Sequence, residues 1–257
     1  MATILVTGSS DGIGRQTAST LAANGHRVVL HARNAERAEQ ARAAVPEAAA
    51  VVQGDLTSLA ETRQLADQAA AAGPYDVVIH NAGVGGGQDA PVRTADGLER
   101  IFQVNVLAPY VLTALLPWPA RLVYLTSGLE ADGIPRLDDL QWQDREWQGM
   151  QAYSDSKLYD VLLAFAVARR RPELLSNAVD PGWIRTRMGG PGATDELSAG
   201  AETPVWLATS DEPAATVTGR YFKRRREQRA NPAAYQEDLQ EQLLARCAEL
   251  SGVTLPD

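Results

Sequence analysis

Two ionisable side chains four residues apart are the first sign of chemistry in this sequence of 257 residues. Tyr153 and Lys157 stand in the run Tyr-Ser-Asp-Ser-Lys, which opens an apolar helical stretch at 158–168. Residues at this spacing share one face of a helix. An ammonium beside a phenol favours the phenolate, so the pair could exchange a proton with a substrate oxygen near neutral pH. Taken alone, the spacing is more typical of an ordinary surface pair.

A glycine-rich turn near the start of the chain predicts a phosphate site. Residues 7–14 are Thr-Gly-Ser-Ser-Asp-Gly-Ile-Gly, after an apolar run and before a helix-forming one. A diphosphate needs close approach of the backbone and free N–H groups at a helix amino terminus, and glycines permit both. The alternative is a glycine-rich turn without a ligand. The residues predicted to contact a nucleotide are Thr7, Gly8, Ser10, Asp11, Gly12, Ile13 and Gly14.

The end of the second predicted strand indicates which nucleotide binds. Ala32 stands where an NAD site would carry a carboxylate for the ribose hydroxyls. The guanidinium of Arg33, which follows, suits a 2′-phosphate, and Arg15 could assist it. We therefore predict NADP(H) as the cofactor. The alternative is that Arg33 is an ordinary surface arginine.

A carboxylate follows the third predicted strand, in Gly54-Asp55-Leu56. Asp55 is placed to accept a hydrogen bond from an adenine amino group, so we predict that Asp55 and Leu56 contact the cofactor. Its competing role is to cap the following helix, which Ser58 could also do.

Short apolar runs alternate with longer helical stretches along the whole chain. The runs are rich in Val, Ile and Leu and do not alternate with polar residues, so both of their faces should be buried. This pattern predicts an α/β Rossmann-type fold, a doubly wound parallel sheet flanked by helices. No linker or repeat divides the chain, so we predict one domain over 1–257. The predicted strands are 4–7, 27–31, 50–53, 76–80, 121–126 and 174–179, and the predicted helices are 13–24, 35–45, 59–72 and 94–116.

Three further segments depart from this rhythm. The insertion at 128–150 and the Gly- and Pro-rich loop at 187–198 are long enough to be elements of a substrate cleft. Residues 232–250 have helical spacing and predict a terminal helix. The basic run at 223–226 is expected to be a solvated face.

Large apolar side chains in and beside these segments predict a lipophilic or aromatic substrate. The two tryptophans of the insertion could instead only pack it onto the core. The side chains concerned are Trp142, Trp147, Met150, Trp183 and Met188.

Composition limits the classes of function. No apolar run is long enough to span a bilayer, and no basic segment precedes the first apolar run, so we expect a cytoplasmic protein without a secretory signal. The single cysteine, Cys247, excludes an internal disulfide and a cysteine-based zinc site. The three histidines lack the spacing of metal ligands, so no metal is expected. A net charge of −8 argues against nucleic acid as a partner, and a homo-oligomer is compatible with the sequence.

Taken together, the motifs resemble the short-chain dehydrogenase/reductase family over nearly the whole chain. Residues 151–158 and 219–222 are most similar to the branch related to retinol dehydrogenases. His80 departs from the family's Asn-Asn-Ala-Gly pattern in its first residue. In the family's order, the motifs are the glycine loop at 7–14, Asn81-Ala82-Gly83, Asn105, Ser127, Tyr153-x-x-x-Lys157 and Pro181-Gly182.

The resemblance implies an NADP(H)-dependent oxidoreductase that acts on a small carbonyl or alcohol. Tyr153 would exchange the proton with the substrate oxygen, and Lys157 would assist it and bind the nicotinamide ribose. Ser127 would donate to the carbonyl oxygen, and Asn105 would hold a water in a proton relay. Further residues implied to line the cofactor are Asn81, Ala82, Gly83, Pro181, Gly182, Trp183, Ile184 and Thr186.

Two other classes of function use related sequences. A non-catalytic NADP(H)-binding sensor or scaffold could share the fold, but the complete set of Ser, Tyr, Lys and Asn counts against it. Sugar-nucleotide epimerases and dehydratases also carry Tyr-x-x-x-Lys. They usually have a differently spaced glycine loop and a longer carboxy-terminal domain, for which this chain has no room.

Overall fold

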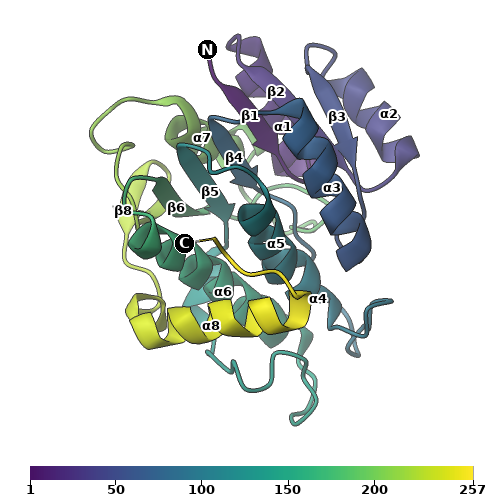
Figure 1. The fold of residues 1–257 in the computed structure, drawn as a ribbon, viewed down its shortest axis with the longest axis vertical. Coiled ribbons are helices and arrows are strands. Elements are labelled where there is room, and N and C mark those ends of the chain that lie inside the picture. The colour runs from purple at the N-terminus through teal and green to yellow at the C-terminus, as the bar shows by residue number, and fades with distance from the viewer. Residues whose placement is uncertain (257) are drawn as a thin grey trace.

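One mostly parallel sheet runs through the centre of the computed structural model, which describes residues 1–256 (Figure 1). The strand order is β3-β2-β1-β4-β5-β6-β7-β8, and only β8 is antiparallel to its neighbour. The predicted doubly wound sheet is confirmed, and its six predicted strands agree with the structure to within one residue at each end. The strands are β1 (Thr3–Val6), β2 (Arg27–Ala32), β3 (Ala50–Gln53), β4 (Val77–His80), β5 (Arg121–Leu125), β6 (Leu175–Asp180), β7 (Tyr221–Lys223) and β8 (Arg226–Gln228).

Helices cover both faces of the sheet and enclose two apolar cores. One core packs under α3, α5, α6 and α8, and the other under α1, α2 and α7. No helix within residues 1–256 is both long and apolar enough to cross a membrane. The helices are α1 (Gly12–Ala23), α2 (Ala35–Ala44), α3 (Leu59–Ala72), α4 (Arg100–Phe102), α5 (Ala108–Leu115), α6 (Gly149–Arg170), α7 (Leu197–Thr209) and α8 (Glu237–Ser251).

The segment predicted as one helix over 94–116 is more complex, so that prediction was wrong in detail. Gly97 turns the chain with a φ of 77°, and helix begins only at Arg100. The side chain of Glu99 caps it by accepting hydrogen bonds from the N–H groups of Ile101 and Phe102. A π-helical turn, Gln103–Leu107, then separates α4 from α5.

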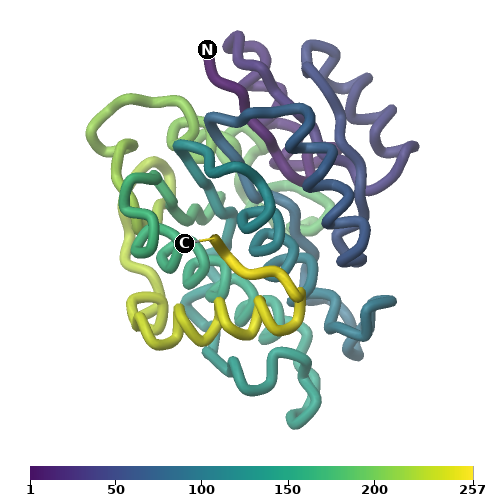
Figure 2. The backbone as a smooth tube through the Cα atoms, in the orientation of Figure 1, coloured from purple at the N-terminus to yellow at the C-terminus, as the bar shows by residue number. Residues whose placement is uncertain are grey.

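The predicted terminal helix at 232–250 is also interrupted. A 3₁₀ turn, Pro232–Tyr235, precedes α8. After α8 the chain runs back along α5 (Figure 2), where the Tyr110 hydroxyl donates to the Val253 carbonyl and accepts from the Leu255 N–H.

The basic run at 223–226 forms a hairpin that the sequence analysis did not predict. Arg224 and Arg225 occupy a two-residue turn between β7 and β8 with φ of 50° and 58°, the left-handed conformation that such hairpins require. The run remains largely exposed, as expected of a solvated face, and three of its four charges also pair with carboxylates. The ion pairs are Lys223–Asp180 at 2.7 Å, Arg224–Asp195 at 3.2 Å, Arg225–Glu202 at 3.6 Å and Arg225–Glu212 at 3.5 Å.

The outer edge of the sheet at β3 is occupied by a side chain. The amide of Gln68, on α3, accepts a hydrogen bond from the Gln53 N–H at 3.0 Å. It also donates to the Gln53 carbonyl at 2.9 Å. Gln68 thus supplies the backbone of Gln53, at the end of β3, with the hydrogen-bond partners that a neighbouring strand would offer.

Candidate active site

The predicted site residues meet at the carboxyl edge of the sheet. The glycine loop follows β1, the Asn81-Ala82-Gly83 turn follows β4, Ser127 follows β5 and 181–186 follows β6. The strand order reverses between β1 and β4, and doubly wound sheets bind ligands at such a reversal.

Side chains from neighbouring strands hold the glycine loop in place. The Gly8 N–H donates to Nδ1 of His31 at 3.0 Å, and Nε2 of His31 bonds to the Gly54 carbonyl at 2.9 Å. Burial lowers the pKa of His31, so the ring is neutral and can accept at one nitrogen while donating at the other. This role of His31 could not be predicted from the sequence, because a histidine near the end of a strand carries no distinctive spacing.

Asn81 supports the same loop. Its amide donates to the carbonyls of Thr7 at 2.8 Å and Gly8 at 3.2 Å. A Cβ at Gly14 would lie 2.3 Å from Nδ2 of Asn81, so this glycine is required by the packing of the loop itself. A Cβ at Gly12 would meet only the Thr186 side chain, at 3.4 Å, which leaves that side of the loop accessible.

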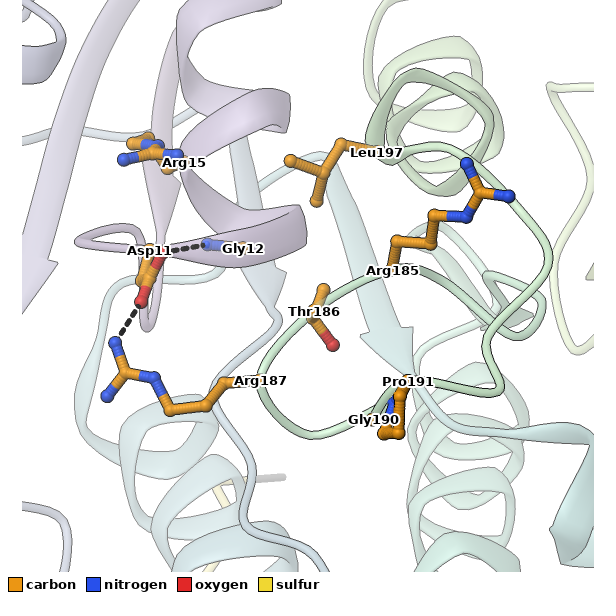
Figure 3. A pocket seen from close by; sticks show the side chains of 9 residues that line it. All are labelled: Asp11, Gly12, Arg15, Arg185, Thr186, Arg187, Gly190, Pro191 and Leu197. Carbon is orange, nitrogen blue, oxygen red and sulfur yellow. Dashed lines mark hydrogen bonds and ion pairs between the residues drawn. The ribbon is translucent and has the colours of Figure 1, made fainter.

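A cleft of about 510 Å³ adjoins the amino terminus of α1 (Figure 3). Three arginines line it, namely Arg15, Arg185 and Arg187. Arg187 reaches across to Asp11 at 2.8 Å, and Asp11 in turn caps α1 through the Gly12 N–H (Figure 3). Guanidinium groups and the positive end of a helix both favour anions, so the cleft fits a dinucleotide diphosphate.

The predicted adenosine end of the site lies beyond β2 and β3. Ala32 is buried, and Arg33 is exposed and forms no ion pair within residues 1–256. One oxygen of Asp55 accepts from the N–H and the hydroxyl of Thr57, while Ser58 caps α3. The side chain of Leu56 is buried in the core, so only its backbone faces this region.

Tyr153 and Lys157 lie on the second and third turns of α6. The ammonium of Lys157 lies 5.8 Å from the centre of the Tyr153 ring. It donates to the Leu125 carbonyl at 2.9 Å and to Oδ2 of Asp160 at 2.8 Å. The sequence analysis missed Asp160, because it stands in a stretch treated as apolar. Its spacing of three residues from Lys157 was the available signal.

Ser127 and Asn105 lie on two other elements. Ser127 caps the 3₁₀ turn Gly128–Asp132, and because its oxygen accepts from the Leu129 N–H, its hydroxyl hydrogen is available to donate. Asn105 lies in the π-helical turn. Its Oδ1 accepts a hydrogen bond from the Val84 N–H, and its Nδ2 donates to the Val84 carbonyl. It also donates to the Ser156 hydroxyl, which donates to the Tyr153 carbonyl.

Exposed apolar side chains stand around the carboxyl edge. A second cleft, of about 720 Å³, is lined by Leu129 and Asp132 from the 3₁₀ turn and by 148–151 and Ser154 from the start of α6. The apolar residues with at least a third of their surface exposed in this region are Leu129, Met150, Trp183 and Met188.

Trp142 and Trp147 instead pack beneath the insertion. Their ring centroids are 5.2 Å apart, and they contact Ile101 and Ala152. The indole N–H of Trp147 donates to the Gln88 carbonyl. This arrangement favours the packing interpretation over contact with a substrate.

Trp142→Phe should therefore destabilise the protein without altering catalysis. We expect the free energy of unfolding to fall by about 1–3 kcal/mol, because the ring packs against Trp147 and under Arg145. Urea unfolding and steady-state kinetics on the folded fraction would measure both quantities. A raised KM at unchanged stability would identify Trp142 as a substrate contact.

Comparisons with known proteins agree with these features. The model of the family described as short chain dehydrogenase matches residues 2–118. The Short-chain dehydrogenase chyC of Penicillium rubens is 44% identical, with 100% of both chains covered. Retinol dehydrogenase 13 of Homo sapiens is 32% identical over 99% of this chain and 86% of its own.

Two solved structures extend the comparison. A protein from Mycobacterium paratuberculosis superposes with a TM-score of 0.86 at 27% identity, with 100% of this chain and 96% of the other covered. A blue fluorescent protein from a metagenomic library, solved in complex with NADPH, has a TM-score of 0.69 at 27% identity, covering 86% and 95%.

Proposed function

The chain belongs to the short-chain dehydrogenase family of oxidoreductases, and we propose that it transfers a hydride between NADP(H) and the carbonyl or alcohol carbon of a lipophilic substrate. One observation carries the proposal. The buried Lys157 ammonium beside Tyr153 lies at the same sheet edge as the arginine-lined cleft. A proton-transfer group and an anion site are thus held on one rigid scaffold.

In the proposed reduction, the bound nicotinamide supplies the hydride and the protein manages the oxygen. Ser127 donates its hydroxyl hydrogen to the carbonyl oxygen and polarises it. Tyr153 gives the proton that converts this oxygen to a hydroxyl. Lys157 favours the phenolate that remains and binds the nicotinamide ribose. Asn105 holds the Val84 backbone and the Ser156 hydroxyl in the turn that follows Tyr153. We also propose that it holds a water molecule that relays protons to the site.

We assign each part of the cofactor to a part of the site described above. The diphosphate would lie on the glycine loop beside Arg15 and Arg187. Residues 81–83 and 181–186 would flank the nicotinamide. Asp55 would face the adenine with its second carboxylate oxygen, because the first holds Thr57.

The preference for NADP(H) over NAD(H) is a prediction of its own. NADPH should bind at least about 10-fold more tightly than NADH, because Ala32 offers no carboxylate to the ribose and Arg33 has a free guanidinium for the 2′-phosphate. Arg33→Asp should shift the preference toward NADH. Titration with both nucleotides measures it, with Arg42→Asp, an exposed arginine of α2, as the control. Equal affinities for the two nucleotides in the wild type would contradict the assignment.

The proposed substrate class is supported by the exposed apolar side chains of the 3₁₀ turn after β5, the start of α6 and the loop after β6. We propose a lipophilic or aromatic ketone, aldehyde or alcohol. The test is a panel of carbonyls and alcohols graded in hydrophobicity, followed by the absorbance of the reduced cofactor. Turnover should increase with apolar surface. NADPH binding without turnover of any member would favour a non-catalytic sensor instead.

A further inference from the structure

A buried carboxylate beside Lys157 has no part in the mechanism above. Asp160 follows Lys157 by three residues on α6, and its side chain is 4% exposed against 6% for Lys157. The two groups are 2.8 Å apart. Ion pairs at this spacing on a helix surface contribute little, but here both charges have been removed from water.

We propose that Asp160 is a positioning residue that keeps Lys157 in its ammonium form and leaves one N–H of that ammonium for the cofactor. The inference rests on the proposed role of Lys157 in binding the nicotinamide ribose. An ammonium has three N–H groups. The Leu125 carbonyl takes one and Asp160 takes another, which fixes the direction of the third.

The Gly83 turn after β4 lies next to this ammonium. A Cβ at Gly83 would lie 3.7 Å from Nζ of Lys157 and 3.4 Å from Oδ1 of Asn105. The backbone of Gly83 therefore passes close to the ammonium without a side chain between them.

Burial alone would remove the proton that this role requires. A lysine without a partner in a protein interior loses its charge readily, since the ammonium is poorly solvated there. Burial pulls the pKa of Lys157 down, but the charge of Asp160, a negative charge on Tyr153 and the hydrogen bond to Asp160 together more than offset it, so the pKa lies above its usual value. Burial raises the pKa of Asp160 to about 6, although the Lys157 charge opposes this. Above that pH the carboxylate is ionised.

Apart from Tyr153, whose negative charge also favours the ammonium, the neighbouring ionisable groups do not replace Asp160. Tyr153 precedes Lys157 on the same helix, and Tyr124 on β5 is hydrogen-bonded through Thr113 to His80 on β4. Burial lowers the pKa of His80 to about 3 and raises the pKa of Tyr124, so both are neutral. Within residues 1–256, Lys157 forms an ion pair with Asp160 alone. Three carboxylates of other elements packed against α6 have partners other than Lys157: Glu130 is held by Asn231, Asp180 by Lys223, and Glu241 by Arg169 and Arg170.

The composition of the chain makes a direct test practical, because Lys157 and Lys223 are its only lysines. Protein with ¹³C at the lysine ε carbon should give two signals, which Lys223→Arg assigns. In the wild type, the ε-carbon chemical shift of Lys157 should stay at the value of an ammonium to above pH 10. In Asp160→Asn, the titration midpoint of Lys157 should fall by at least about one pH unit, because the carboxylate no longer offsets the cost of burying the ammonium.

A second readout connects the charge to the cofactor. The NADPH dissociation constant of Asp160→Asn should rise about 10-fold over the pH range in which Lys157 loses its proton, relative to the wild type. Asp155→Asn is the matched control, since Asp155 is equally buried on α6 but pairs with Arg145 at 3.1 Å. It should leave the Lys157 titration unchanged.

An identical Lys157 midpoint in the wild type and Asp160→Asn would overturn the inference. If Asp160→Asn does not fold, the wild type still provides the test, because a Lys157 that loses its proton below its ordinary value of about 10.4 has no effective partner. Asp160→Glu should restore the wild-type midpoint. A lowered midpoint with no matching change in NADPH affinity would uphold the role of Asp160 and contradict the proposed ribose contact of Lys157.

Discussion

Tyr153→Phe should lower kcat by at least about 10²-fold and leave NADPH binding intact. The substitution keeps the ring and removes only the hydroxyl. Without that hydroxyl, hydride transfer to a carbonyl would build an alkoxide with no acid beside it. The Tyr153 hydroxyl makes no hydrogen bond within residues 1–256, so its loss should not alter the stability of the fold.

Steady-state kinetics on any substrate turned over by the wild type would measure this effect, together with a nucleotide titration. Tyr159→Phe is the matched control on the same helix. Its hydroxyl donates to the Ile134 carbonyl, away from the proposed site, so kcat should be unchanged while stability falls by about 1 kcal/mol. A fully active Tyr153→Phe enzyme would mean that the proposed chemistry is wrong.

Lys157→Ala should lower both kcat and cofactor affinity, in contrast to Tyr153→Phe. It removes the charge that favours the phenolate and the group proposed to hold the ribose. We expect a loss of at least about 10²-fold in kcat and of about 10-fold in NADPH affinity. Measuring the two variants side by side separates proton transfer from cofactor binding. An unchanged NADPH affinity in Lys157→Ala would exclude the ribose contact.

Stability has to be separated from function in this variant. Removing Lys157 leaves Asp160 buried without its partner, which should also destabilise the fold. Adding Asp160→Asn to Lys157→Ala removes the unpaired charge. The double variant should recover stability without recovering activity, as urea unfolding and kinetics would together establish.

The central sheet could be predicted closely because its signal is local. Most of the first six strands are short runs rich in Val, Ile and Leu with mostly buried residues, and turn residues mark where most of them end. The hairpin of β7 and β8 gave no such signal. Its turn consists of two arginines, which are held by contacts distant in sequence: Arg224 pairs with Asp195, and Arg225 pairs with Glu202 and Glu212.

The proposed site was predictable where a motif is contiguous and not where it depends on tertiary contacts. The glycine loop and Tyr153-x-x-x-Lys157 are continuous in sequence. His31 acts by bridging Gly8 and Gly54, which lie in different βα units. The true start of the helix at Arg100 depends on the Glu99 cap, which the apolar pattern around it conceals.

Both ends of the sheet are closed to the addition of another strand, which bears on how copies of the chain could associate. At one end Gln68 occupies the hydrogen-bonding groups of Gln53, and at the other β8 is only three residues long, exposed and charged. Short, charged or covered edges oppose edge-to-edge aggregation. Concentrated solutions of the folded protein should therefore resist β-type polymerisation, and we expect any assembly to use surfaces other than the strand edges.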